Sequence, residues 1–296
     1  MIRSKIRRLI NLYKLLWVND DINNLLAEID LIRNQLENQR YTMREEADLY
    51  MSRLDVPREL CDELRIWREQ TPIPQEPMVS VCVATYNRAR LLTERSIPSV
   101  LSQTYRNFEL IVVGDNCSDE TEKLVAKIND PRLKFVNLPE RGRYPTDPLR
   151  RWMVAGTQAI NHAMSLAQGD YVTHLDDDDE YLPERLEKLV TFAVTNKYDL
   201  VWHPFWMENP NNEWYLLEAP AFTFSQVTTG SVFYRSWFTK IQWDIQAHRL
   251  MEPGDWNRYR RIKYLGPIAQ RYPEPLLRHY RQGTQMQQPP EGESAK

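Results

Sequence analysis

Residues 79–88 read VSVCVATYNR, a run of apolar and β-branched residues that ends in the polar stretch TYNR. A short run of this kind, closed by a polar turn, is typical of a buried strand. Apolar residues with helical spacing follow over residues 91–101, so this part of the chain predicts a strand, a loop and a helix in succession. The loop stands at the carboxyl end of its strand, where open α/β sheets bind their ligands.

The same order of elements recurs along the chain. Further strands are expected at residues 108–113, 133–136, 171–175, 200–203 and 230–234. Helices are expected near residues 124–128, over residues 152–167 and from Pro183 onward. Strands that alternate with helices form βαβ units, so we expect an α/β fold with a mostly parallel sheet flanked by helices.

Composition divides the chain into four segments. Residues 1–70 are expected to form a helical N-terminal extension. Residues 71–77, TPIPQEP, are expected to be a linker, because proline ends helices and favours extended backbone. The catalytic domain is expected over residues 78–282, and the polar residues 283–296 predict a disordered tail.

The extension carries a heptad pattern. Apolar residues recur at alternating steps of three and four residues at Val18, Ile22, Leu25, Ile29, Ile32 and Leu36. Such a seam is typical of a helix that packs on another helix, either in a second copy of the chain, giving a coiled-coil homo-oligomer, or in its own catalytic domain. Basic residues precede the seam at Arg3, Lys5, Arg7, Arg8 and Lys14. Peripheral contact of this helix with an anionic membrane is therefore a third interpretation.

Composition and charge exclude several classes of protein. A formal net charge of -3 and a pI near 6.0 create no positive field over the whole chain, so no nucleic-acid partner is expected. The three cysteines lack C-x-x-C spacing and support neither a disulfide framework nor a zinc site. The apolar stretch at residues 9–18 is too short to span a bilayer, and no signal-peptide cleavage site follows it. We expect a cytoplasmic protein, either free or peripheral at the inner face of the membrane.

Four consecutive aspartates, Asp176 to Asp179, follow the strand expected at residues 171–175. Adjacent carboxylates repel one another unless a cation neutralises them or solvent screens them. Mg²⁺ and Mn²⁺ prefer oxygen ligands and commonly take one or two carboxylates, with substrate phosphates in other positions. The cluster predicts a divalent metal that bridges a diphosphate, with a solvated acidic loop before the next helix as the alternative.

Three motifs together resemble family 2 glycosyltransferases. They are ATYNR at residues 84–88, VVGDNCSDET at residues 112–121 and LDDDDEYLPERL at residues 175–186, and their order and spacing also match. The resemblance covers residues 78–280. It implies a GT-A fold, which is a Rossmann-like, mostly parallel sheet flanked by helices. It also implies metal-dependent, inverting transfer of a sugar from a nucleotide-sugar donor to an acceptor hydroxyl.

The resemblance assigns the nucleotide pocket to the first two motifs. Thr85, Tyr86 and Arg88 match the loop that lines this pocket in the family, and Asp115 matches the acid that accepts a hydrogen bond from uracil. A uridine diphosphate (UDP) sugar is therefore the expected donor. Guanosine and thymidine diphosphate sugars stay open, because Gly114 stands where the family often has a second aspartate.

The third motif supplies the expected metal site. Asp176 and Asp178 fall at the outer positions of the family's D-x-D signature and are expected to hold Mn²⁺ or Mg²⁺, with Asp178 as the direct ligand. Asp177 is expected to face the donor sugar or its ribose. The resemblance implies that the metal neutralises the diphosphate as it leaves.

The resemblance also places a carboxylate at the start of a late helix. In the segment MEPGDWNRYRRI the acid at the matching place is Asp255, the expected general base. A carboxylate that only complements the helix dipole is the alternative. Acceptor or sugar contacts are expected from Gly230 and Ser231, whose small side chains leave room for a sugar, and from Glu252 and Trp256.

The predicted function is a single sugar transfer in polysaccharide or glycan biosynthesis, onto an acceptor that the sequence does not identify. The region before the aspartates is longer than is common in the family, and Arg143 or Arg151 either replaces a phosphate-binding arginine or lies on the surface. A nucleotidyltransferase is one rival, but it wraps its phosphates in a glycine-rich loop, and TYNRARL contains no glycine. A catalytically silent nucleotide-binding scaffold is the other.

Overall fold

The structure is a computed structural model that describes residues 2–281, with side chains described from residue 22 onward. The side chains of the basic turns before the heptad seam and the tail at residues 283–296 lie outside the described part of the chain, and the predictions for them stay predictions. The chain separates into two compact units between Leu54 and Asp55. The segment boundaries predicted at residues 70, 77 and 282 likewise stay predictions.

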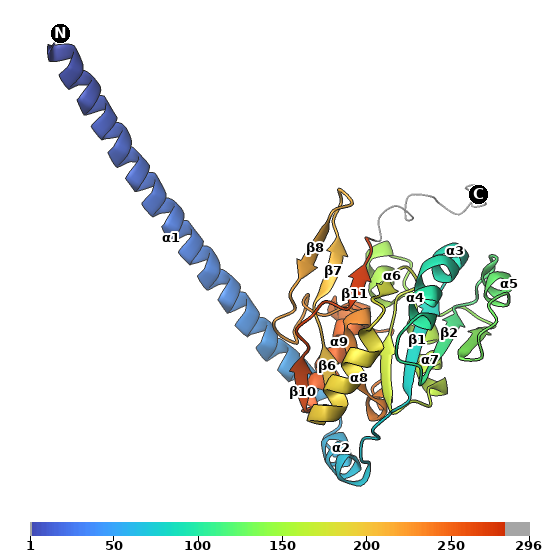
Figure 1. Cartoon of the computed structure of the whole chain (residues 1–296). Helices are drawn as coiled ribbons and strands as arrows, with labels where there is room; N and C mark the ends of the chain where they lie inside the picture. The colour runs from blue at the N-terminus through green and yellow to red at the C-terminus, as the bar shows by residue number, and fades with distance from the viewer. Residues whose placement is uncertain (1, 282–296) are drawn as a thin grey trace. The chain divides into compact units, whose positions relative to one another are not determined.

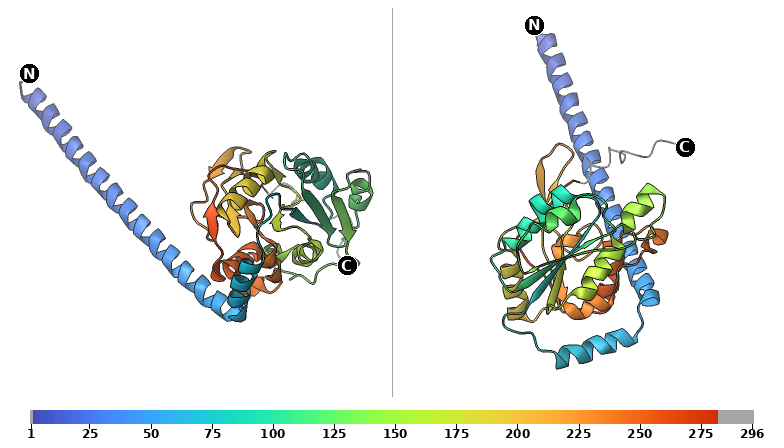
Figure 2. Two further views of the ribbon diagram at one scale, coloured as in Figure 1. Left: turned by 60° about the horizontal axis from the view of Figure 1, so that its bottom comes forward. Right: turned by 90° about the vertical axis from the view of Figure 1, so that its right-hand side faces the viewer.

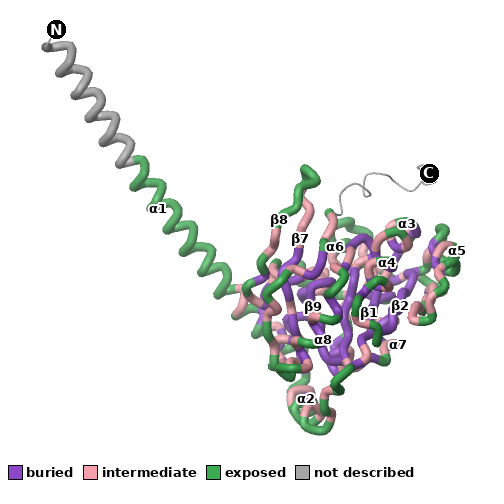
Figure 3. Tube along the Cα trace, in the orientation of Figure 1, coloured by how far each residue is buried: buried purple, intermediate pink, exposed green. Residues whose placement is uncertain are grey.

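The first unit is a single long helix, α1 (Ile2–Asp55), so the expected helical extension is present. Over residues 22–43 every side chain of α1 is exposed (Figure 3). The partner of the heptad seam is therefore not decided by the fold, and the coiled coil stays a prediction. Among the described residues, no helix combines the length and the apolar character that crossing a bilayer requires.

The second unit contains all the strands and the remaining helices of the described chain (Figure 1). Its α-helices are α2 (Glu59–Gln70), α3 (Ala89–Leu91), α4 (Ile97–Leu101), α5 (Thr121–Val125), α6 (Pro148–Val154), α7 (Thr157–Leu166), α8 (Arg185–Asn196) and α9 (Gly254–Tyr264). One π-helical segment, η1 (Leu92–Ser96), joins α3 to α4. The 3₁₀ helices are η2 (Thr229–Ser231), η3 (Ser236–Lys240) and η4 (Ala247–Leu250).

Seven strands form the main sheet, in the order β10-β6-β9-β4-β1-β2-β3. They are β1 (Val79–Thr85), β2 (Phe108–Gly114), β3 (Leu133–Asn137), β4 (Tyr171–His174), β6 (Leu200–Trp202), β9 (Val232–Arg235) and β10 (Ala269–Arg271). Strands β4, β1, β2 and β3 pair in parallel, whereas β9 is antiparallel to both of its neighbours. The strand order reverses beside β1, and such a switch point opens a crevice at the carboxyl ends of the strands.

A smaller sheet has the order β5-β11-β7-β8. Its strands are β5 (Glu180–Tyr181), β7 (Phe205–Glu208), β8 (Trp214–Leu217) and β11 (Leu277–His279). Leu277 of β11 pairs with Tyr181 of β5. This pairing brings a segment near the end of the described chain beside the loop that carries the four aspartates.

Helices cover both faces of the main sheet (Figure 2). Successive side chains of a strand point to opposite faces. Val81 accordingly packs in one buried cluster with Leu92, while Cys82 packs in the other with Ile160 and Tyr259. Burial on both faces explains the near-continuous apolar run from which β1 was predicted.

The predicted strands at residues 79–84, 108–113, 133–136, 171–175 and 200–203 correspond to β1, β2, β3, β4 and β6. The single helix predicted over residues 152–167 is wrong. It is two helices, α6 and α7, because Gly156 between them adopts a left-handed φ of 79°, which ends a right-handed helix. The strand predicted over residues 230–234 begins only at Val232, because Gly230 and Ser231 belong to η2.

Candidate active site

The carboxyl ends of β1 and β4 open into a cavity of about 1220 Å³. Its walls come from the loop after β1, the aspartate cluster after β4, helix α6, the start of α9 and strands of the smaller sheet. The predicted site residues that line it are Thr85, Tyr86, Arg88, Asp176, Asp177, Asp178, Asp255 and Trp256. Side chains from three separate sequence regions therefore meet at the switch point of the sheet, where α/β proteins bind ligands.

Tyr86 presents its ring in the cavity next to Arg141. The guanidinium carbon of Arg141 lies 3.5 Å from the centre of the Tyr86 ring, so the two groups are stacked. Nε of Arg141 also lies 3.7 Å from Oδ2 of Asp115. The arrangement offers a flat, partly charged surface of the kind on which a planar ring can stack.

Arg88 ties the loop after β1 to the aspartate cluster. Its Nη1 donates to Oδ1 of Asp177 at 2.9 Å and to Oδ2 of Asp178 at 2.8 Å. Burial opposes the positive charge of Arg88, but the attraction of Asp177 and Asp178 outweighs it and raises the pKa of the guanidinium. One cation thus balances two nearly buried carboxylates.

Asp115 is buried at the end of β2 and does not line the cavity. Its Oδ1 accepts a hydrogen bond from the backbone N–H of Gly142 at 3.1 Å, and its Oδ2 faces Arg141. In this structure the residue predicted to bind the base therefore lies behind Arg141. A uracil could reach Asp115 only if Arg141 moved.

Packing explains why residue 114, just before Asp115, is a glycine. A Cβ at Gly114 would lie 2.5 Å from Oδ1 of Asn137. That oxygen is held in place because it accepts a hydrogen bond from the backbone N–H of Cys117 at 2.8 Å. The side chain of Asn137 thus fills the space that a second aspartate needs.

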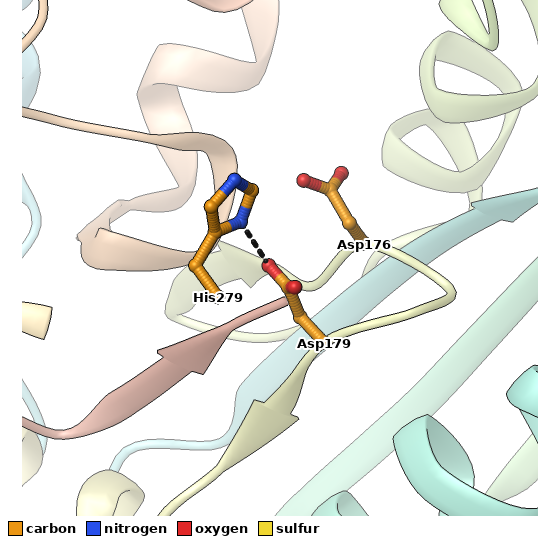
Figure 4. A group of neighbouring side chains, drawn as sticks. All are labelled: Asp176, Asp179 and His279. Carbon is orange, nitrogen blue, oxygen red and sulfur yellow. Dashed lines mark hydrogen bonds and ion pairs between the residues drawn. The ribbon is translucent and has the colours of Figure 1, made fainter. Parts of the chain in front are cut away.

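Asp176, Asp179 and His279 each offer one ligand atom, and these atoms all lie within 4.8 Å of one another (Figure 4). Nδ1 of His279 is 2.7 Å from Oδ2 of Asp179, and Oδ1 of Asp179 accepts from the backbone N–H of Tyr280 at 2.9 Å. Both oxygens of Asp179 are therefore engaged, and only Asp176 and His279 of the three line the cavity. Asp179 orients the ring of His279, as carboxylates behind metal-binding histidines do.

The charges of the cluster fit a cation. Desolvation, followed by repulsion from Asp179 and other aspartates, raises the pKa of Asp178 to about 6 and that of Asp176 well above its usual value. Oδ1 of Asp178 is buried and has no hydrogen-bond partner within residues 2–281. A buried carboxylate oxygen without a partner is costly. A hard divalent ion would satisfy it and relieve the repulsion, so the residues present fit Mg²⁺ or Mn²⁺.

Asp255 lies in the first turn of α9 and lines the cavity. Its Oδ1 accepts a hydrogen bond from the backbone N–H of Trp256 at 2.7 Å. Desolvation raises the pKa of Asp255 to about 6, although the helix N–H partly offsets this. The carboxylate is then ionised at neutral pH while its proton affinity is close to that expected of a general base.

The predicted contact of Glu252 with acceptor or sugar is not supported by its position. Glu252 is buried and does not line the cavity. Its carboxylate accepts from Nε of Arg260 at 3.0 Å and from Nδ2 of Asn257 at 2.8 Å. These bonds hold the start of α9, so the contacts of Glu252 are structural.

Gly230 and Ser231 are also buried and outside the cavity lining. A Cβ on Gly230 would meet both methyl groups of Leu277 at 3.0 Å, so the glycine makes room for β11 and not for a sugar. The hydroxyl of Ser231 closes a reciprocal cap with Thr228. Thr228 and Thr229 line the cavity in their place.

Sequence patterns missed part of the site. His279 lies 100 residues beyond Asp179 in the chain, and its place two residues after the apolar pair Leu276 and Leu277 is only a weak signal. Trp152 and Trp243 line the cavity but have no distinguishing pattern. Of the two arginines considered for phosphate binding, Arg151 lines the cavity and Arg143 does not.

The mostly parallel sheet, with helices on both faces and the aspartate cluster at the carboxyl ends of its strands, defines a GT-A-type α/β protein. The sequence profile of Glycosyl transferase family 2 matches residues 80–146 and 150–263, which is more than half of the chain. The chain therefore belongs to this family of enzymes, and the predicted family, fold class and enzyme class are confirmed.

Two relatives illustrate the similarity. The chain is 37% identical over 137 residues to the putative colanic acid biosynthesis glycosyl transferase WcaA of Escherichia coli K12, covering 45% of this chain and 42% of the relative. It is 28% identical over 135 residues to the UDP-Glc:alpha-D-GlcNAc-diphosphoundecaprenol beta-1,3-glucosyltransferase WfgD of Escherichia coli, covering 46% and 48%. The chain thus spans less than half the length of these curated relatives.

Among solved structures, the chain resembles S. aureus TarS 1-349 in complex with UDP. The TM-score is 0.54 at 19% identity, and the match covers 69% of this chain and 60% of that one. At this level of identity the similarity shows a shared fold.

Proposed function

We propose that the chain is a metal-dependent, inverting glycosyltransferase that moves a sugar from a nucleoside diphosphate sugar to an acceptor hydroxyl. The observation that carries this proposal is the meeting of Asp176, Asp178 and Asp255 in one cavity. Two of these carboxylates suit a cation that faces a diphosphate, and the third suits a general base. A protein that only bound the nucleotide would not need the general base, Asp255.

The donor proposal rests on the loop after β1. The stacked pair of Tyr86 and Arg141 offers a surface for a nucleobase, and Asp115 stands behind it as a hydrogen-bond acceptor. WfgD is named as using UDP-Glc, which supports a UDP-sugar as the donor. Arg141 would shift from Asp115 toward the nucleotide as the base enters.

The metal would be held by Asp178, through its unpartnered oxygen, together with Asp176 and His279. When bound, Mn²⁺ or Mg²⁺ would neutralise the negative charge that grows on the diphosphate. Asp179 keeps His279 in position, and Arg88 keeps Asp177 and Asp178 next to the donor loop.

Asp255 supplies the chemistry at the acceptor. Its carboxylate takes the proton of the acceptor hydroxyl while that oxygen bonds to the anomeric carbon. The bond between the anomeric carbon and the diphosphate oxygen breaks on the opposite side, and the nucleoside diphosphate leaves with the electron pair. Because the new bond forms opposite the old one, the configuration at the anomeric carbon is inverted.

We assign the acceptor to the side of the cavity where α6 forms an apolar wall. Leu149 and Trp152 of α6 line the cavity and are 53% and 47% exposed. Aromatic rings pack well on the CH-rich faces of sugars, so Trp152 is a candidate platform for a glycan acceptor. The names of WcaA and WfgD refer to colanic acid and to a lipid-linked sugar, and they support a role in polysaccharide or glycan biosynthesis.

The test is donor turnover. The protein is incubated with UDP-, GDP- and dTDP-sugars in the presence of Mn²⁺, and nucleoside diphosphate release is measured with and without oligosaccharide acceptors. We expect release from one nucleotide class, loss of release in EDTA, and an inverted product by NMR. A product with retained configuration, or binding of donors without any turnover, would contradict the proposal.

A further inference from the structure

The heptad seam of α1 is an exposed apolar stripe. Its described members, Ile22, Leu25, Ile29, Ile32 and Leu36, are each 47–57% exposed. A stripe with this repeat buries itself against another helix. We propose that α1 pairs with the α1 of a second copy of this chain in a parallel, in-register, two-stranded coiled coil. This inference does not depend on the catalytic activity of the second unit.

The first heptad of the seam has the residues typical of two-stranded coiled coils. With Ile22 at heptad position a, Ile29 and Leu36 also fall at a, and Leu25 and Ile32 fall at d. β-branched residues at a together with leucine at d favour parallel dimers. Ile22 at a and Leu25 at d follow this rule, whereas Ile32 at d and Leu36 at a depart from it.

The charges beside the seam select the orientation. Glu28 falls at position g and Arg33, five residues later, at position e. In a parallel, in-register pair, g of one helix faces the next e of the other, so Glu28 meets Arg33 of the second copy. An antiparallel pair instead faces e with e, which brings together the edges that carry Arg33 and Arg40.

Arg33 is able to make this contact. Its ion pair with Asp30 spans 3.4 Å and is 65% and 68% exposed, and pairs of this kind hold their partners weakly. The rest of the helix surface is polar at positions such as Asn24, Asn34 and Glu37. Leu26 and Leu31 are further exposed apolar residues outside the seam, but only the seam residues follow one another in a continuous heptad stripe.

The described part of α1 does not favour an anionic membrane as the partner. Residues 22–43 contain the acids Glu28, Asp30 and Glu37 against the bases Arg33 and Arg40. Membrane-surface helices carry an excess of lysine and arginine on their polar face. A second copy of the chain offers the complementary charges that this segment needs.

The test compares two variants of the full chain by sedimentation equilibrium. Ile29→Lys places a charge in the seam, and Leu31→Lys places the same charge on the outer face, where Leu31 is 59% exposed. We expect the wild type and Leu31→Lys to have twice the 35.3 kDa monomer mass. Ile29→Lys should weaken association by about a hundredfold or more, because the seam would bury an unpaired charge. Unchanged helicity by circular dichroism shows that both variants are folded.

Orientation is tested by disulfide cross-linking. Gln39 falls at position d, and Gln39→Cys, in a chain whose native cysteines are serine, should form a covalent dimer under oxidation only if the helices are parallel and in register. A monomer mass at about 100 µM, equal loss of association in both lysine variants, a trimer mass, or no cross-link would each overturn the proposal. Co-sedimentation of a monomeric chain with phosphatidylglycerol vesicles would assign α1 to the membrane instead.

Discussion

Asp255→Asn should make the protein more stable and inactive. The replacement keeps the shape of the side chain and the bond from the backbone N–H of Trp256, but it removes the buried charge. A pKa raised from 3.8 to about 6 corresponds to about 3 kcal/mol at about 1.4 kcal/mol for each pH unit. Because Asp255 is partly exposed to the cavity, screening by solvent reduces the expected gain to about 1–2 kcal/mol.

The stability that Asp255→Asn gains over the wild type should increase as the pH rises. Below the unfolded pKa of 3.8 the carboxyl is neutral in both states, and its ionisation costs nothing. As pH rises through the folded pKa of about 6, the folded state bears the full cost of the charge, and stability is lost. The variant should therefore melt roughly 2–8 °C above the wild type at pH 8, and by about half as much at pH 5.

The activity of the same variant tests the role of Asp255. Loss of a general base lowers kcat by about 10²–10⁴-fold, and kcat/KM of the wild type should fall below about pH 6. Asp244→Asn is the matched control, because Asp244 lies outside the cavity lining. A fully active Asp255→Asn enzyme would refute the assignment as base, and a destabilised one would refute the argument from burial.

Asp179→Asn should raise the Mn²⁺ concentration for half-maximal activity by about 10–100-fold, since His279 loses the carboxylate that orients it; an unchanged Mn²⁺ titration would contradict this. Gly254→Ala should lower kcat, because the new Cβ would lie 3.2 Å from the ring of Trp243 and displace the start of α9; wild-type kinetics would count against it. Gly114→Ala should cost about 1–3 kcal/mol of unfolding free energy in urea, because it displaces a held Asn137, and the double variant with Asn137→Ala should recover part of it.

Much of the fold could be predicted because the parallel strands are buried on both faces. Strand β1 appears in the sequence as VSVCVAT, and the polar residues that follow it mark the end of the sheet where the cavity lies. The break between α6 and α7 could not be predicted from apolar spacing. It depends on the left-handed backbone at Gly156, and helix interiors also contain glycine.

The candidate site was predicted where its residues are local to a strand end and missed where they depend on tertiary pairing. Asp176 and Asp178 lie within four residues of the end of β4. His279 reaches them only because Leu277 of β11 pairs with Tyr181, a contact that no local pattern shows. Glu252 is close to Asp255 in the sequence and was therefore expected in the site. Its carboxylate is instead held by Nε of Arg260, a residue of α9.

The most direct test of a metal-dependent nucleotide-sugar site is calorimetric binding of UDP, with and without Mn²⁺, to the wild type and to Asp178→Ala. We expect Mn²⁺-dependent binding to the wild type, and little or no Mn²⁺ effect in the variant, because Asp178 supplies the unpartnered buried oxygen. Equal Mn²⁺-dependent binding to both proteins would contradict the metal site. Absence of UDP binding to the wild type under either condition would contradict the uridine assignment.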